Sequence, residues 1–388
     1  MLKNYFLDAE ESQELGLFED SLIRFCDSEI EPFYRDWERA GIVPAELFRK
    51  MGESGFLCCD VPGRYGGASA SVSFNFKVIE LMSRRGYAGL VGGLQVHTDV
   101  IPPYLKHFAT EGQRELWLPR LVRGTTIAAI GMSEPGAGSD LKAIRTRAER
   151  DGGSYVVNGS KIFISNGQNA GLIVLAAKTD PSAGARGVSL FLVDTASPGF
   201  ARGRNLEKIG QHSADTSELY FNDMRIPADA LLGGVEGCGF EQMMHALPRE
   251  RLIIGVQCAG AARGALELTT RYVLEREAFG KPLAQLQNTR FKLAECATQL
   301  AAAESMLNTC CEAYRRGELG ADAASACKLY TSEVYGRIAD ECLQLFGGYG
   351  YMAEYPISRF YADARVIRIY GGASEIMKEL VARSLLGR

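Results

Sequence analysis

The middle of the sequence restricts the fold most strongly, because residues 125–221 contain only short strand-like segments. The segments span residues 125–132, 145–149, 154–157, 162–164, 172–177, 188–193 and 219–221, with Gly and Asn between them. Asp151-Gly152-Gly153 is a hairpin turn signal. Strands and helices do not alternate here, which excludes a doubly wound nucleotide-binding fold and predicts a compact β domain or barrel.

Helical periodicity dominates both sides of this region. Before it, apolar residues recur at helical spacing in residues 15–26, 47–51, 74–85, 92–108 and 111–121, with Pro102-Pro103 as an interruption. After it, the chain reads as helical from about Gly239 to the end. We therefore expect an α+β multidomain protein with a helical N-terminal domain (residues 1–124), a β middle domain (residues 125–235) and a helical C-terminal domain (residues 236–388).

The composition argues against several classes of protein. With 43 basic and 47 acidic residues, the chain shows no sign of a nucleic-acid surface. No apolar run approaches the roughly 18 residues of a membrane span, and the acidic N-terminal residues resemble neither a signal peptide nor a transit peptide. The ten cysteines lack a C-x-x-C pair and the four histidines are scattered. We expect buried thiols, no metal site and a cytoplasmic location.

One carboxylate, Glu250, is placed beside a segment with the character of a buried helix. Pro248 fits the first turn of a helix, and most of residues 252–261 are small and apolar, as in a helix packed on nearly all sides. Two interpretations of Glu250 stay open at this point. It is either an acid that favours the helix dipole or a group with a chemical role.

Two motifs of the β region are suited to a flat or anionic ligand. Residues 133–140 (SEPGAGSD) form a loop whose glycines let backbone N–H groups approach a ligand closely. Residues 161–167 (KIFISNG) are expected to place Phe163 and Ser165 on one face of a strand, an aromatic plane beside a hydroxyl. A plain turn and an ordinary edge strand are the alternatives.

Three more motifs interrupt the C-terminal helices. In residues 276–283 (REAFGKPL), Arg276 ends one long helix and either binds a pyrophosphate or caps the helix. Residues 344–351 (QLFGGYGY) close another long helix with glycines that either stop it or admit a ligand. Residues 369–376 (IYGGASEI) combine two glycines with a helix that we expect Ser374 to cap, which gives a donor-rich loop.

In this order the five motifs resemble those of the acyl-CoA dehydrogenase family, and the resemblance covers essentially the whole chain. It implies a helical N-terminal domain, a β-barrel middle domain and a C-terminal four-helix bundle. It also implies FAD-dependent α,β-dehydrogenation of an acyl-CoA thioester to the trans-2-enoyl-CoA, with hydride transfer to flavin N5. Residues 351–357 (YMAEYPI) and 377–383 (MKELVAR) look most like the long-chain branch, which favours a medium- to long-chain acyl group.

One position departs from the commoner pattern of the family. In most members the last loop reads IYEGT and its Glu is the catalytic base, whereas this chain has Gly371. In the long-chain and isovaleryl branches the base comes from an LxxERL segment, which here is residues 247–252 (LPRERL). The resemblance therefore implies Glu250 as the base, and the backbone N–H of Gly371 as a donor to the thioester oxygen.

The resemblance also implies which residues bind the cofactor and the substrate. The FAD would contact Met132, Ser133, Gly138, Ser139, Phe163, Ile164, Ser165, Arg276, Phe279, Leu286, Gln287, Gln344, Leu345, Gly347, Gly348 and Glu375. The acyl-CoA would contact Ser139, Arg251, Tyr370 and Gly372. Ala373, where the family usually has Thr, is given no role.

The residues around Arg276 and Gly347 serve a neighbouring subunit in the family, which implies at least a dimer, usually within a homotetramer. The implied electron acceptor is an electron-transfer flavoprotein.

Several alternatives to a medium- to long-chain acyl-CoA dehydrogenase stay open. These are an isovaleryl-like dehydrogenase of short branched substrates, a dehydrogenase of carrier-protein-bound acyl groups, a flavin oxidase or monooxygenase, and a catalytically silent binding protein. Pocket depth should depend on Gln95, Val96 and His97, although a hydrogen-bonded core position is expected for His97. With substrate bound, we expect burial and the apolar substrate to raise the pKa of Glu250 more than the helix N-terminus and two flanking arginines lower it.

Overall fold

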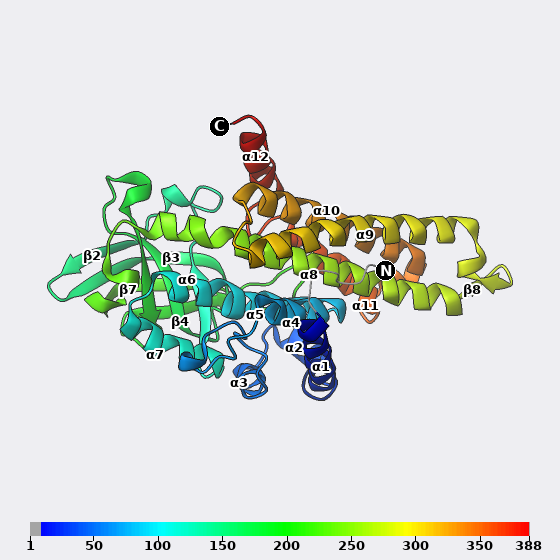
Figure 1. Ribbon diagram of the computed structural model, residues 1–388, viewed down its shortest axis with the longest axis horizontal. Helices are drawn as coiled ribbons and strands as arrows, with labels where there is room; N and C mark the ends of the chain where they lie inside the picture. The colour runs from blue at the N-terminus through cyan, green and yellow to red at the C-terminus, as the bar shows by residue number, and fades with distance from the viewer. Residues whose placement is uncertain (1–8, 388) are drawn as a thin grey trace.

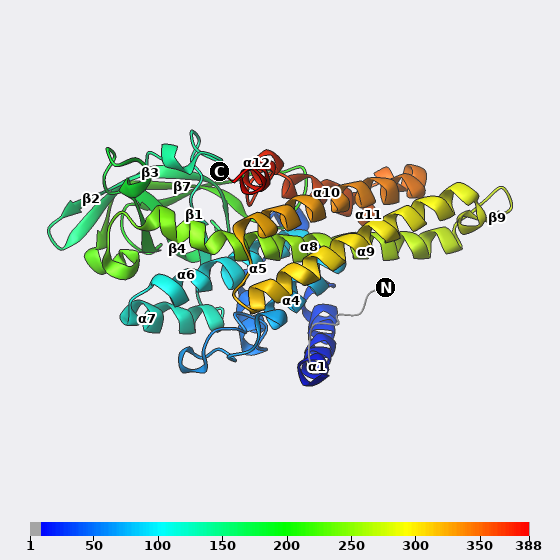
Figure 2. The same cartoon turned by 45° about the horizontal axis from the view of Figure 1, so that its top comes forward.

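The computed structural model describes residues 9–387. A sheet lies at one end, long helices extend from it toward the other end, and the shorter N-terminal helices pack along one side (Figure 1). The same arrangement is seen in the turned view (Figure 2). The C-terminal helix α12 (Ser374–Leu385) projects from the body of the molecule in Figure 1.

The first region is helical, as predicted. Its helices are α1 (Ala9–Phe25), α2 (Tyr34–Ala40), α3 (Ala45–Glu53), α4 (Val72–Arg84), α5 (Ala88–Gln95), α6 (Ile101–Phe108) and α7 (Glu111–Val122). Thr110 and Gln113 form a capping box that starts α7. The expected interruption at Pro102-Pro103 is instead the first turn of α6, where a missing N–H costs little. A π-helical segment, Val96–Val100, joins α5 to α6.

The middle region forms a seven-stranded curled sheet with the order β1-β4-β2-β3-β7-β6, and β5 pairs with β4. The strands are β1 (Ile127–Gly131), β2 (Arg147–Asp151), β3 (Ser154–Ser165), β4 (Ala170–Lys178), β5 (Val188–Asp194), β6 (Phe200–Asn205) and β7 (Thr216–Pro227). The predicted hairpin joins β2 to β3, with Asp151 opposite Ser154 and a positive φ of 60° at Gly152.

Two details of the sheet differ from the prediction. Residues 154–157 and 162–164 belong to one strand, β3, whose pairing with β7 is interrupted by irregularities between Val157 and Gly159 and between Lys161 and Ile164. The sequence also gave no sign of β6. Its residues, FARGRN, are largely exposed at the edge of the sheet and lack alternating apolar residues.

The last region contains α8 (Gly239–Glu275), α9 (Gln287–Arg315), α10 (Ala321–Phe346), α11 (Pro356–Ile367) and α12. A short hairpin of β8 (Glu277–Ala278) and β9 (Lys281–Pro282) connects α8 to α9. The predicted start of the helical region near Gly239 is confirmed, but the placement of Pro248 in the first turn of a helix is wrong, because Pro248 lies inside the 37 residues of α8. Gly239, Gln242, Met243 and Ala246 are buried at helical spacing and extend α8 backward. The helix-dipole interpretation of Glu250 therefore does not apply.

Small residues let α8 pack closely against α4. A Cβ atom added to Gly260 would lie 2.5 Å from the carbonyl oxygen of Glu80, and one added to Gly264 would lie 2.0 Å from that of Arg84. These glycines allow the backbones of α8 and α4 to come into contact, which is one reason why the residues of α8 after Glu250 are small. Across residues 9–387, no helix is long and apolar enough to cross a membrane.

Candidate active site

Glu250 lies well inside α8 and is partly accessible. Tyr104 of α6 is fully buried and donates its hydroxyl to Glu250 Oε1 at 3.1 Å. The adjacent arginines turn elsewhere: Arg249 pairs with two aspartates, and Arg251 donates to Ser325 Oγ of α10 at 3.1 Å. The carboxyl of Glu250 thus has a hydrogen-bond donor at one oxygen but is not tied to either neighbouring cation.

These surroundings raise the pKa of Glu250 to about 7. Burial is the main cause, because removal of water disfavours the charged carboxylate. The hydrogen bond from Tyr104 and the charge of Arg251 lower the pKa by less. Burial thus outweighs the opposing effects. A carboxyl group with a pKa near 7 is suited to accept a proton at neutral pH.

Arg249 is the centre of a buried ionic network beside this carboxyl. Its guanidinium lies 2.6 Å from Asp60 Oδ2 and 2.9 Å from Asp99 Oδ1. Lys106 of α6 also contacts Asp60 Oδ2, at 2.6 Å. Because breaking a buried ion pair leaves an uncompensated charge and is strongly destabilising, this network holds α6 against α8. Asp60 and Asp99 were not predicted, because they are far from Arg249 along the chain and lie in no recognisable motif.

The turn at Gly371 contacts the same face of α8 as Glu250. Gly371 and Gly372 have positive φ angles of 63° and 98°. A Cβ atom at position 371 would lie 2.2 Å from Ile254 Cδ1, and Ile254 follows Glu250 by one helical turn. The backbone N–H groups of Gly371 and Gly372 have no acceptor among residues 9–387. They are therefore available to a ligand.

A buried cation holds this turn. Lys328 of α10 donates its Nζ to the carbonyl oxygen of Gly372 at 2.7 Å. The prediction that Ser374 caps α12 is wrong, since Ala373 occupies the N-cap position and Ser374 Oγ donates to Glu333 Oε1 at 3.2 Å. The turn is thus fixed from α10 rather than by its own serine. Lys328 was not predicted, because a lysine in a long helix carries no signal of such a contact.

Three polar side chains meet beside α8, where Gln95 Nε2 also donates to the carbonyl oxygen of Ile253 at 3.3 Å. Tyr370 donates its hydroxyl to Gln257 Oε1 at 2.9 Å, and Gln95 Nε2 donates to the same oxygen at 3.1 Å. Of the residues predicted to bind substrate, Tyr370 and Gly372 therefore lie beside the face of α8 that carries Glu250. The guanidinium of Arg251 instead points into the protein toward α10. Ser139 lies in the exposed loop after β1.

The two motifs of the sheet lie together, as expected. The N–H of Ile162 donates to the carbonyl oxygen of Ser133 at 3.0 Å, and Lys161 Nζ donates to the carbonyl oxygen of Met132 at 3.1 Å. Lys161 also forms a buried ion pair with Glu134 at 2.8 Å. The loop that contains Gly138 is therefore fixed to β3. The structural role of this pair was not predicted, although both residues belong to the quoted motifs.

Phe163 is 66% exposed and has a positive φ of 61° at an irregularity of β3. Side chains therefore do not alternate strictly between the two faces of the strand from Lys161 to Ser165. The expectation that Phe163 and Ser165 share a face stays a prediction. Ile164 is buried in the sheet core. Asn166, just after the strand, donates to the carbonyl oxygens of Gly93 and Ala128, both at 2.9 Å. These bonds tie β3 to α5 and β1.

The other predicted cofactor residues form a separate site at the far end of the helices. Arg276, Gln344, Leu345, Gly347 and Gly348 line a groove with a volume of about 560 Å³. The guanidinium of Arg276 lies 5.4 Å from the centre of the Tyr349 ring. Gly347 and Gly348 face open space, so a ligand can approach their backbone closely. Leu286 and Gln287 begin α9 beside the hairpin, whose Phe279 is 93% exposed.

The two groups of cofactor residues are separated within one chain. The hairpin of β8 and β9 lies at one end of the molecule in Figures 1 and 2, and β3 lies near the other end. Glu375 belongs to neither group, since it is exposed in the first turn of α12. One chain therefore does not bring all the predicted cofactor residues together.

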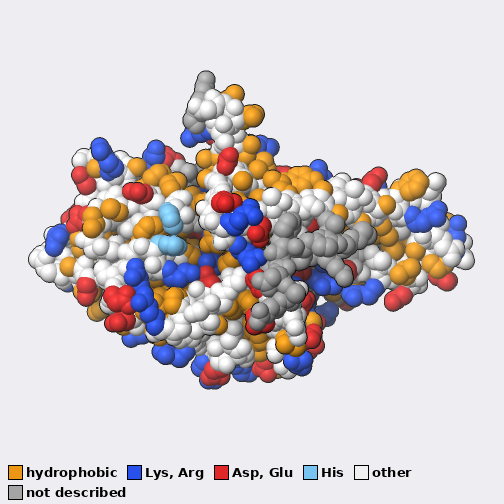
Figure 3. Space-filling model, in the orientation of Figure 1, with side chains coloured by type: hydrophobic (Ala, Val, Ile, Leu, Met, Phe, Trp, Pro, Cys, Tyr) orange, Lys and Arg blue, Asp and Glu red, His pale blue; other side chains and the backbone are white. Residues whose placement is uncertain are grey.

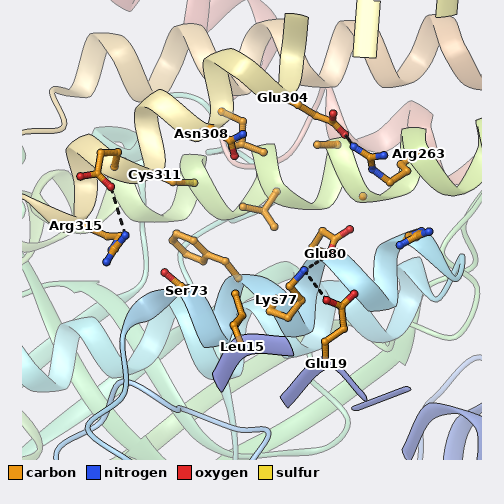
Figure 4. Close-up of a pocket in the computed structure, with 17 residues that line it drawn as sticks. Leu15, Glu19, Ser73, Lys77, Glu80, Arg263, Glu304, Asn308, Cys311 and Arg315 are labelled. Carbon is orange, nitrogen blue, oxygen red and sulfur yellow. Dashed lines mark hydrogen bonds and ion pairs between the residues drawn. The ribbon is translucent and has the colours of Figure 1, made fainter. Parts of the chain in front are cut away.

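A pocket of about 320 Å³ lies elsewhere, between α1, α4, α8 and α9 (Figure 4). Charged side chains around it are paired, with Lys77 close to Glu19 and Glu80, and Arg263 close to Glu304. Its α8 residues, such as Val256 and Ala259, lie on the side of the helix opposite to Glu250. None of the predicted site residues lines this pocket.

Metal-binding clusters are absent from residues 9–387. His97 is a buried core residue, as expected. Its Nε2 bonds to the carbonyl oxygen of Leu121 at 3.0 Å and its Nδ1 accepts from the N–H of Ala128 at 3.2 Å. The ten cysteines are free, and all are buried except Cys238 and Cys311, which are half-buried.

Family models of acyl-CoA dehydrogenases match three consecutive parts of the chain. The N-terminal domain model matches residues 12–125, the middle domain model residues 129–224 and the C-terminal domain model residues 237–386. The chain belongs to the acyl-CoA dehydrogenase family.

Individual relatives agree with this assignment. The chain is 41% identical to a long-chain specific mitochondrial acyl-CoA dehydrogenase of Sus scrofa, over 97% of this chain and 87% of the relative. It resembles the crystal structure of an acyl-CoA dehydrogenase from Geobacillus kaustophilus with a TM-score of 0.94 and 43% identity, over 98% and 99% of the two chains. A glutaryl-CoA dehydrogenase from Mycobacterium smegmatis in complex with FADH2 matches with a TM-score of 0.91 and 30% identity, over 99% and 96%.

Members of this family use FAD, and the chain is an FAD-dependent acyl-CoA dehydrogenase. The residues of the structure fit such a cofactor. An exposed aromatic side chain, Phe163, stands beside a glycine-containing loop on the sheet. An open groove with a guanidinium and two unobstructed glycines, Gly347 and Gly348, suits a pyrophosphate group.

Proposed function

We propose that Glu250 is the base in the α,β-dehydrogenation of an acyl-CoA thioester to the trans-2-enoyl-CoA. The observation that carries this proposal is the state of its carboxyl group, which is partly accessible and has a pKa near 7. Glu250 takes the proton from the α-carbon. Bound FAD supplies the acceptor for the hydride that leaves the β-carbon.

The turn at Gly371 supports the proton transfer. A thioester α-proton is too weakly acidic for a carboxylate in water, so the negative charge that develops on the thioester oxygen needs fixed donors. The unpaired backbone N–H of Gly371 is such a donor. Lys328 holds the next carbonyl group and so fixes the orientation of the turn. Compared with family members that have Glu at this position, Gly371 lacks the carboxylate but keeps this backbone N–H group.

We propose a medium- to long-chain acyl group as the substrate, on the strength of the similarity to long-chain specific relatives. The acyl chain would run along α8 past Ile254 toward Gln95 and Gln257. Anaerobic titration with straight-chain acyl-CoAs of four to eighteen carbons and with isovaleryl-CoA tests this directly. Fastest bleaching of the bound flavin by medium or long chains supports the proposal. Fastest bleaching by short or branched chains favours the isovaleryl-like alternative.

We further propose that two copies of the chain complete each cofactor site, within a homotetramer. The separation of Phe163 from Arg276 supports this arrangement. Exposed apolar side chains near the groove also support it, namely Leu274, Phe279, Phe291, Tyr351 and Met352. Figure 3 shows further hydrophobic side chains gathered along the edge over α10. The proposed domain boundaries lie after residues 124 and 235.

The proposed electron acceptor is an electron-transfer flavoprotein, and the proposed location is the cytoplasm. Reoxidation of the substrate-reduced enzyme tests the first of these. Slow reoxidation in air and fast reoxidation by an added electron-transfer flavoprotein support the proposal. Rapid reoxidation in air with release of peroxide supports a flavin oxidase instead.

A further inference from the structure

We infer that Tyr104 is a positioning residue for Glu250: its hydroxyl fixes one carboxyl oxygen and leaves the other to accept the proton. This inference rests on the proposed role of Glu250 as the base. Tyr104 Oη donates to Oε1 at 3.1 Å, and Tyr104 is fully buried. A buried hydroxyl needs a partner, and the carboxyl of Glu250 is the acceptor that the structure provides. A base needs such a constraint, because a small error in its orientation reduces the rate of proton transfer strongly.

The ionic network around Arg249 gives Tyr104 a fixed place. Asp99 lies just before α6 and Lys106 lies within it, so the two residues flank Tyr104 in the sequence. Asp99 pairs with Arg249, which precedes Glu250 on α8. Lys106 reaches the same arginine through Asp60. The donor and the acceptor of the Tyr104–Glu250 hydrogen bond are thus each within a few residues of a buried ion pair, and they cannot move apart easily.

The hydrogen bond also has an electrostatic effect. It stabilises the charged carboxylate and lowers the pKa of Glu250, against the larger effect of burial. The proton of Tyr104 itself stays in place, because burial and the nearby Glu250 raise the pKa of the phenol well above its ordinary value. Tyr104 therefore acts through Glu250 and has no proton-transfer step of its own.

The test is the pH dependence of flavin reduction in Tyr104→Phe. The rate in the wild type rises with pH as Glu250 ionises, so loss of the hydrogen bond should move this rise to higher pH. A net hydrogen-bond contribution of typical size corresponds to a shift of about 0.5–1 pH unit. We expect kcat to fall several-fold at pH 7, with little change in KM. If Tyr104→Phe does not fold, the same measurement is made on Tyr104→Met, which also removes the hydrogen-bond donor.

Tyr335→Phe is the matched control. Tyr335 is also buried, and it donates to one acceptor, the carbonyl oxygen of Phe360, at 2.9 Å. This variant should lose stability without a shift of the pH profile. An unshifted profile in Tyr104→Phe would overturn the inference. A Glu250→Gln variant that still turns over would instead overturn the proposed base, so the two failures are distinguishable.

Discussion

Ile254 Cδ1 occupies the space that a side chain at Gly371 would need, 2.2 Å from the position of its Cβ atom. The backbone of Gly371 also has a positive φ of 63°, which residues with side chains rarely adopt. Both features show that this turn is built around glycine.

We expect Gly371→Ala to lower both stability and turnover. The added methyl group meets Ile254 and the backbone is strained, which together should cost about 2–4 kcal/mol of unfolding free energy. Gly317→Ala is the control, since Gly317 also has a positive φ (73°) but faces open space. Thermal melts should show a clearly smaller loss for Gly317→Ala. The double variant Ile254→Val/Gly371→Ala lacks the clashing atom and should recover part of the loss. Equal losses in both glycine variants would show that the contact with Ile254 has no effect.

We expect Glu250→Gln to stabilise the protein at pH 8 and to have little effect at pH 5. The pKa of Glu250 is about 7 in the folded protein, above its ordinary value of 4.5. The folded state therefore binds the proton more tightly than the unfolded state does, and stability falls as the pH rises from about 4.5 to 7. A neutral glutamine avoids this loss. The difference in melting temperature between variant and wild type, measured at both pH values, checks this sign. A higher melting temperature at pH 5 only would contradict it.

We expect Glu250→Gln and Arg276→Ala to complement each other when they are co-expressed. Each variant alone should be inactive or nearly so, the first for lack of a base and the second for weak FAD binding. A mixed dimer contains one site with an intact Glu250 and the other copy's intact Arg276. Random mixing should therefore restore about a quarter of the wild-type activity. Activity no higher than that of either parent would show that each chain completes its own site.

Much of the fold could be predicted from the sequence because its signals are local. The strand-rich region, the flanking helices and the glycine turns follow from periodicity and turn chemistry. Strand β6 was missed because an edge strand of polar residues has no apolar alternation. Pro248 was wrongly placed in the first turn of a helix because a proline is usually a boundary, whereas here the buried residues before it belong to the same helix, α8.

The candidate site was predictable only in part. Glu250 and Gly371 stood out because the carboxylate that the family's commoner pattern has at position 371 is missing, while the LPRERL segment supplies one at position 250. Tyr104, Asp60, Asp99 and Lys328 did not, because their roles depend on contacts between residues far apart in the chain. The irregularity at Phe163 likewise depends on the pairing of β3 with β7, which alternation along one strand does not reveal.

The role of Glu250 as the base is tested most directly by the rate of flavin reduction by acyl-CoA in Glu250→Gln, measured by anaerobic stopped flow with FAD content checked in the same sample. We predict a rate about 10³-fold lower than in the wild type, with FAD and substrate still bound. Glu250→Asp keeps a carboxylate at a shorter reach and should retain an intermediate rate. A rate in Glu250→Gln within a few-fold of the wild type would contradict the assignment of Glu250 as the base.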